Sequence, residues 1–181
     1  MCPMRFFYFY ILINFAFLYS TPTGEKILSG KFDIHRKNKE LIISQKDPKG
    51  IIEWDHFTIN KGEITRFNQL SKDCAVLNRV VGKDLSKIYG KLESNGKVFL
   101  LNEKGILISK DAIIDVGSFI ASTLNLTDQC FLEENTLNFS GDSKESVINL
   151  GKISASDDIY LISRKVENKG YLRCERDSRI N

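Results

Sequence analysis

The sequence predicts an all-β fold in which short strands stack into a solenoid, and three observations favour it. Short apolar runs recur after residue 24, for example at residues 41–43, 98–101 and 160–162. Gly, Asn, Asp and Ser separate these runs, and no window keeps the apolar spacing of an amphipathic helix. A strand–corner–strand pattern also recurs at a fixed distance, which is the signature of stacked repeats.

Composition limits the classes of protein to consider. A chain of 181 residues is long enough for one domain with a real core. Hydrophobic residues make up 42% and charged residues 27%, as in an ordinary globular protein. The net charge is only +3, and charges of both signs are interspersed without a basic block. We therefore expect no nucleic-acid partner.

The first twenty residues have the layout of a secretory signal peptide. Arg5 precedes an apolar run over residues 6–18, which only Asn14 interrupts, and small turn-forming residues follow at 20–24. The run is short for a membrane span. We expect residues 1–20 to be removed after Ser20; a buried core strand or an uncleaved anchor is the alternative.

The cysteines do not predict a disulfide framework or a metal site. Cys2 leaves with the signal peptide, and Cys74, Cys130 and Cys174 remain as an odd number at wide spacings. Small buried hydrophobic side chains are the simpler interpretation. We expect no cofactor and no bound metal.

Residues 21–50 are rich in charge and contain only short apolar pieces. We expect them to form an N-terminal cap, because the open edges at a solenoid end need a cover. Further along, residues 127–129 and 140–144 are predicted to form loops. Asn95-Gly96 is the strongest turn signal, and alone it would favour a β-hairpin.

The fixed distance is 19 residues. Val147-Ile148-Asn149-Leu150-Gly151 is followed 19 positions later by Val166-Glu167-Asn168-Lys169-Gly170. A related segment at residues 113–119 has a similar pattern, but its distance from the other two is not a multiple of 19. Chance recurrence of a common turn is the alternative. If the repeat is real, six residues should lie at the corners of stacked coils: Asp115, Gly117, Asn149, Gly151, Asn168 and Gly170.

An ordered set of motifs resembles a known family. Residues 51–59, IIEWDHFTI, resemble its opening I-x-W-x-x-F-x-I, and further matches follow at 75–80, 86–92, 95–102, 105–106 and 121–124. The family is the N-terminal secretion domain of two-partner-secretion exoproteins, of the filamentous-haemagglutinin type. The branch with high-molecular-weight adhesins, haemolysins and haem-scavenging exoproteins is the most similar. The resemblance covers residues 51–172.

The resemblance implies a right-handed parallel β-helix with an N-terminal cap and small extra β elements. It also implies a bacterial protein that crosses the inner membrane through the Sec machinery behind its signal peptide. The periplasmic domains of a dedicated outer-membrane β-barrel transporter then recognise it and pass it to the cell surface or the medium. A monomer is expected.

Two departures from the family stand out. The family's N-P-N-G-I motif reads Asn102-Glu103-Lys104-Gly105-Ile106, so the turn loses its proline and about 0.4–1 kcal/mol of stability. The apolar pattern also ends near Gly170, and residues 173–181 are expected to be an irregular tail. We expect a truncated reading frame, with a genuine C-terminal cap as the alternative.

The expected site consists of motif residues that contact the transporter or shape turns. They are Asn78, Arg79, Asn102, Gly105, Ile106, Ser122 and Thr123. A purely structural role for each is the alternative.

An enzyme is not expected. Neighbouring acids such as Asp157 and Asp158 point to opposite faces of a strand, and His35 and His56 are isolated. A polysaccharide-degrading β-helix enzyme and a stand-alone surface adhesin remain as the competing interpretations.

Overall fold

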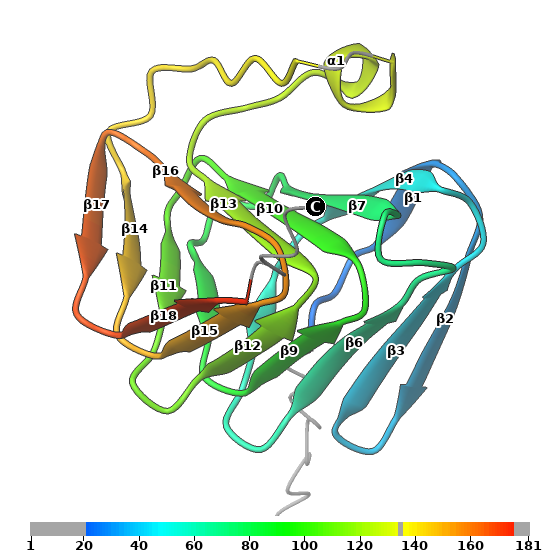
Figure 1. The fold of residues 1–181 in the computed structure, drawn as a ribbon, viewed down its shortest axis with the longest axis horizontal. Helices are drawn as coiled ribbons and strands as arrows, with labels where there is room; N and C mark the ends of the chain where they lie inside the picture. Colours follow the sequence, from blue (N-terminus) through cyan, green and yellow to red (C-terminus); the bar gives the residue numbers. More distant parts are fainter. Residues whose placement is uncertain (1–20, 134–135, 176–181) are drawn as a thin grey trace, which may run out of the picture.

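The chain is a right-handed parallel β-helix, as predicted, with three sheets forming the faces of its coils (Figure 1). The computed structural model describes residues 21–133 and 136–175. The predicted signal peptide at residues 1–20 lies outside this range. In the described part of the chain, no helix is long and apolar enough to cross a membrane.

The first face is a six-stranded sheet. Its order is β1 (Lys26–Ser29), β4 (Lys49–Trp54), β7 (Ala75–Val80), β10 (Lys97–Asn102), β13 (Ser118–Ser122) and β16 (Ile159–Ile162). All neighbours are parallel except β1, which runs antiparallel to β4.

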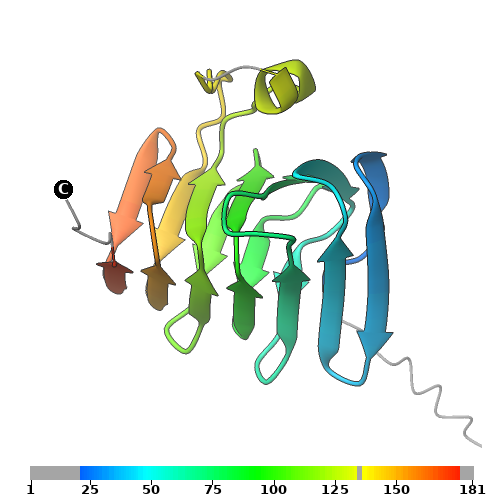
Figure 2. The same ribbon diagram turned by 45° about the vertical axis from the view of Figure 1, so that its right-hand side comes forward.

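The other two faces continue each coil. The five-stranded sheet has the order β17 (Lys165–Asn168), β14 (Ser146–Asn149), β11 (Ile106–Ile108), β8 (Ser86–Ile88) and β5 (Thr58–Ile59). The seven-stranded sheet has the order β18 (Tyr171–Cys174), β15 (Lys152–Ala155), β12 (Ile113–Val116), β9 (Lys91–Ser94), β6 (Ile64–Asn68), β3 (Glu40–Gln45) and β2 (Phe32–Lys37). Each coil therefore visits the three sheets in turn, and successive coils stack side by side (Figure 2).

The residues before the first coil cover one end of the solenoid. Strands β2 and β3 form an antiparallel hairpin, which turns at Asn38 with φ +55°, and β3 then pairs in parallel with β6. Arg36 donates two hydrogen bonds of 2.6 Å to the Glu25 carboxylate and one to the carbonyl of Pro22. The hairpin and the preceding segment are thus joined in one cap. The first coil begins with β4 at Lys49.

The core lies inside the solenoid and consists of inward-facing side chains from all three sheets. Trp54, Phe57, Phe67 and Phe119 are its largest fully buried members, and the rings of Trp54 and Phe57 meet edge to face at 5.8 Å between centroids. Burial of this apolar area drives the stacking of coils.

A second apolar cluster lies on the outer face of the six-stranded sheet. Ile51, Leu77, Phe99 and Ile120 point outward from four neighbouring strands and are covered by Phe131 of the short helix α1 (Asp128–Glu133) and by the residues around it. Figure 2 shows α1 outside the stack of coils. These strands are buried on both faces, which explains why their apolar residues do not alternate with polar ones.

Helix α1 corrects the loop expected at residues 127–129. The Thr127 hydroxyl accepts a hydrogen bond from the backbone N–H of Cys130, as an N-cap does, and the Thr127 carbonyl accepts one from Phe131. A helix of six residues is too short to show periodicity in the sequence.

The structure also places the Asn95-Gly96 turn, which the sequence left open, and the three cysteines. Asn95-Gly96 forms a coil corner between β9 and β10, which belong to different sheets, so it does not make a hairpin. Cys74 and Cys130 are buried as expected, but Cys174 on the last strand is exposed. All three thiols are free, and no cluster of metal-ligating side chains occurs within residues 21–133 and 136–175.

Candidate recognition corner

Three of the sequence motifs meet at one corner of the β-helix. Arg79, Leu101 and Ser122 are register partners near the C-terminal ends of β7, β10 and β13. Segments that are some twenty residues apart in the chain therefore lie side by side. We call this place, made by residues 78–82, 101–105 and 122–125, the recognition corner. It joins the six-stranded sheet to the five-stranded one.

Asn78 lies inside the coil and links three strands. It is fully buried, its Oδ1 accepts a 3.0 Å hydrogen bond from Trp54 Nε1, and its Nδ2 donates to the carbonyl of Phe99 at 3.1 Å. The amide and the indole thus satisfy each other without water, as buried polar groups require. In this position, Asn78 aligns the first coils and presents no group to a partner.

Arg79 points outward but is used within the fold. Its Nη1 lies 2.6 Å from Asp128 Oδ1, its Nη2 donates to the carbonyl of Leu126 at 2.6 Å, and its Nε donates to Asn125 Oδ1 at 3.3 Å. Its side chain is only 16% exposed. The guanidinium therefore fixes the start of α1 to the second coil.

Asn102 shapes the turn that follows β10. Its carbonyl accepts from the N–H of Gly105 at 3.0 Å, and its Oδ1 accepts from the N–H of Lys104 at 2.8 Å. Its Nδ2 donates to the carbonyl of Asp84 and to the Ser86 hydroxyl, both at 3.0 Å. Gly105 has φ +106°, which favours glycine. The turn forms without the family's proline.

The remaining motif residues are also buried. Ile106 contributes to the core, and the Ser122 hydroxyl bonds to both the N–H and the carbonyl of Leu124. Thr123 is buried, and its hydroxyl has no hydrogen-bond partner among the described residues. Its backbone N–H donates to the carbonyl of Ile162 in the last coil.

The exposed part of the corner comes from positions that sequence reasoning left out. Glu103 and Lys104, at the tip of the turn, are exposed. They line a groove of about 260 Å³ together with Val81, Leu124 and Asn125, and the Arg79 side chain forms part of its wall. The two positions where this chain departs from the family motif are thus the accessible ones.

The segment between β13 and β14 forms one wall of this groove and is held at three points. Lys49 donates to the carbonyls of Phe131 and Leu132 at 2.8 and 3.1 Å, and its ammonium lies 5.7 Å from the centre of the Phe131 ring. Arg79 holds the other end of the helix. The Ser143 hydroxyl donates to the carbonyl of Glu103 at 2.7 Å. In the sequence, the sign that this segment covers the sheet is the run of consecutive apolar residues in the strands beneath it, such as residues 98–101.

Of the residues expected at the corners of the repeat, four lie at one corner of the stacked coils and Asp115 does not. Asn149 and Asn168 are register partners and share an Nδ2–Oδ1 hydrogen bond of 2.8 Å. Gly170 packs on the backbone of Gly151, where a Cβ atom would lie 2.1 Å from a carbonyl oxygen. Asp115 does not fit this scheme, because it lies within β12, is exposed and pairs with Ser154.

Gly117 lies at another corner, between the seven-stranded and six-stranded sheets. It packs against the backbone of Gly96, where a Cβ atom would lie 2.8 Å from the Gly96 carbonyl oxygen. Gly117 therefore lies at a corner of stacked coils, but at a different corner from Gly151 and Gly170, and Asp115 lies in the strand before it. The sequence around Asp115 and Gly117 resembles the 19-residue repeat. Gly117, however, follows a strand of the seven-stranded sheet, whereas Gly151 follows a strand of the five-stranded sheet.

Comparison with known proteins agrees with this architecture. A family model described as the TPS secretion domain matches residues 20–177. A heme/hemopexin-binding protein of Haemophilus influenzae is 30% identical over 173 residues, which are 88% of this chain and 18% of that protein. The protein adenylyltransferase and cysteine protease IbpA of Histophilus somni is 26% identical over 134 residues, 68% of this chain and 3% of that protein.

A solved structure also matches. The crystal structure of the HMW1 secretion domain from Haemophilus influenzae has a TM-score of 0.79 and 32% sequence identity, over 84% of this chain and 42% of that one. The chain spans less than a fifth of the length of the two relatives named above. The residues that the family model matches include the strands that build the recognition corner.

Proposed function

Because the chain belongs to the TPS secretion domain family, we propose that a two-partner outer-membrane β-barrel transporter recognises it at the recognition corner. One observation supports this site above others. The three strands that carry the motifs of the recognition corner end side by side at one groove, which Arg79 and Asn102 line together with the exposed Glu103 and Lys104. A docking surface for the periplasmic domains of the transporter needs such a fixed, accessible shape.

In this proposal the buried motif residues act on shape, and the exposed ones make contact. Asn78, Asn102 and Ser122 are buried and use their polar side-chain atoms in internal hydrogen bonds, so they position the turn. Glu103 and Lys104 are the groups that a partner can reach. Charged groups at the rim of an interface act mainly on the rate of association and on specificity.

The proposal includes a route. Residues 1–20 direct the chain through the Sec machinery, and the transporter then takes the protein, as a monomer, across the outer membrane to the cell surface or the medium. Outside, the cap and the first coils nucleate the β-helix, because each later coil buries its apolar side chains on the previous one.

The experiment is co-expression of the full chain with a two-partner transporter from the same genome, with the amount of chain in the medium as readout. Export that depends on the transporter supports the proposal. Equal release without the transporter would contradict it. Glu103→Ala/Lys104→Ala then tests the site, because it alters the exposed tip and leaves the buried hydrogen bonds in place.

A further inference from the structure

A straight row of side chains crosses the seven-stranded sheet at the edge next to the five-stranded sheet. The strand register places seven residues in this row, one from each strand. They are Lys37, Glu40, Ile64, Lys91, Ile113, Lys152 and Tyr171, which we call the basic ladder. Its three lysines and Tyr171 are exposed, so the row lies on the outer surface.

The turns along the same edge add further positive charge. They contribute Lys39, Lys61, Lys110 and Lys169. Two of these are paired, Lys61 with Asp111 at 3.1 Å and Lys169 with Glu167. The Lys37, Lys39, Lys91, Lys110 and Lys152 ammonium groups have no ion-pair partner among the described residues.

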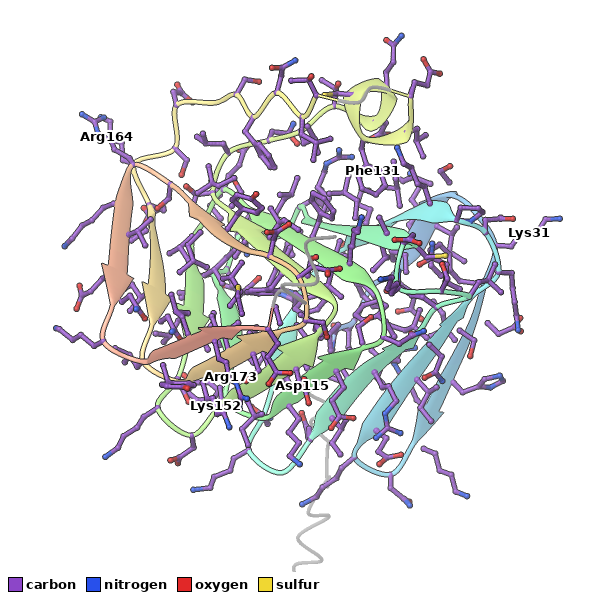
Figure 3. All side chains as sticks on the ribbon, viewed as in Figure 1. Lys31, Asp115, Phe131, Lys152, Arg164 and Arg173 are labelled. Atoms are coloured by element: carbon purple, nitrogen blue, oxygen red, sulfur yellow. The ribbon has the colours of Figure 1, made fainter. Side chains whose placement is uncertain are left out.

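The neighbouring row on the sheet does not cancel this charge. Arg66 and Glu93 neutralise each other at 2.8 Å, and Arg173 further along the same row pairs with Glu175, which leaves the exposed Asp115 as the one carboxylate of this row without an ion-pair partner among the described residues. Figure 3 shows Asp115, Lys152 and Arg173 close together on this side of the molecule. The five lysines without an ion-pair partner thus outnumber the three carboxylates on this side that also have none among the described residues, which are Glu40, Glu63 and Asp115.

The spacing along the ladder is regular. Adjacent parallel strands lie about 4.8 Å apart, so the backbones of Lys91 and Lys152, two strands apart, are separated by roughly 9.6 Å. Ile113 lies between them, and Tyr171 follows Lys152. A shallow hollow of about 270 Å³ beside Lys91 is lined in part by Tyr89 and Ile113.

We propose that the basic ladder binds a linear anionic polysaccharide. Lysines at multiples of the strand spacing match acidic groups repeated along a straight polymer, and the side chains between them offer apolar surface to sugar rings. The ladder offers no exposed arginine fork for bases and only one aromatic ring in its row, which disfavours nucleic acid. The ladder is on the opposite side of the molecule from α1 (Figure 1), so the proposal is independent of the transporter.

The test is fluorescence anisotropy with a labelled short heparin oligosaccharide as a sulfated probe, and with hyaluronan of similar length as a carboxylated one. Lys91→Gln/Lys152→Gln removes two ladder charges. Lys72→Gln/Lys144→Gln removes two exposed charges elsewhere and is the matched control. Thermal unfolding by circular dichroism verifies that each variant is folded.

We expect the ladder variant to weaken binding of at least one probe about tenfold and to lower the slope of log affinity against log salt by about two, with the control unchanged. The probe that responds identifies the acidic group. Equal losses in both variants would overturn the proposal, as would no binding of either probe. Tighter binding of single-stranded DNA of matched charge would assign the edge to nucleic acid and also overturn it.

Discussion

Arg79 and Asp128 join the second coil to helix α1 through an Nη1–Oδ1 contact of 2.6 Å. The same guanidinium donates to the carbonyl of Leu126 and to the side chain of Asn125. An arginine that the sequence motif marks for recognition is thus engaged in holding one wall of the recognition corner. In the proposed function, Arg79 therefore acts on the transporter through the position of that wall.

Arg79→Met should lower the free energy of unfolding by about 1–3 kcal/mol, because it leaves the Leu126 carbonyl without the arginine donor, whereas Asn125 Oδ1 keeps the N–H of Leu126. Urea unfolding measures this. Asp128→Asn should cost under about 1 kcal/mol, since the Asp128 side chain is 47% exposed and water can replace the contact. Equal losses for the two variants would show that the ion pair, and not the carbonyl contact, dominates.

Phe131→Ala should destabilise the protein by about 3–5 kcal/mol, because Phe131 is buried and meets Phe99 edge to face at 5.2 Å. Limited proteolysis of this variant should cut first within residues 124–145. Leu137→Ala is the control, since Leu137 belongs to the same segment but is 37% exposed. Unchanged protease resistance in Phe131→Ala would mean that the segment is held by its polar contacts alone.

Trp54→Phe should cost about 2–4 kcal/mol, since it opens space in the core and leaves Asn78 Oδ1 without a donor. Combining it with Asn78→Leu should recover part of that loss, because an unpaired buried oxygen is removed. Chemical denaturation of the two single variants and the double variant measures the coupling. Simple additivity would contradict the role given to this hydrogen bond.

The cap should weaken in acid. Hydrogen bonds from Arg36 hold the pKa of Glu25 below its usual value of 4.5. A lowered folded-state pKa stabilises the protein above the unfolded pKa, and this contribution disappears as the pH falls through the folded pKa. Glu25→Gln should remove about 0.5–1 kcal/mol near neutral pH and nothing once the wild-type carboxylate is protonated. The difference between the two unfolding curves at each pH tests this; a constant difference would be inconsistent with it.

Short apolar runs separated by turn residues were enough to predict stacked strands, because both the strands and the turns between them are encoded by residues that are close together in the sequence. The pairing of Asn149 with Asn168 could be predicted because the register between the last two coils stays at 19 residues in both sheets that meet at this corner. Earlier coils differ in length, since Lys49 pairs with Ala75 but Lys97 with Ser118, and a fixed period cannot detect them.

Helix α1 and its anchors were not predictable from one sequence. Lys49 reaches Phe131 across 82 residues and Arg79 reaches Leu126 across 47, and such contacts leave no local pattern. The expected corner at Asp115 is not found for the opposite reason. The residues around Asp115 resemble a corner, but Asp115 itself lies within strand β12. The motifs identified the recognition corner, whereas only the fold separates its buried residues from its exposed ones.

The most direct measurement is the affinity of the purified chain for the isolated periplasmic domains of the same-genome transporter. Glu103→Ala/Lys104→Ala should weaken binding about tenfold without lowering the melting temperature. Lys110→Ala/Asp111→Ala, on another exposed turn of the same coil, should bind like the wild type. Wild-type affinity in the first variant, or an equal loss in both, would contradict recognition at this corner.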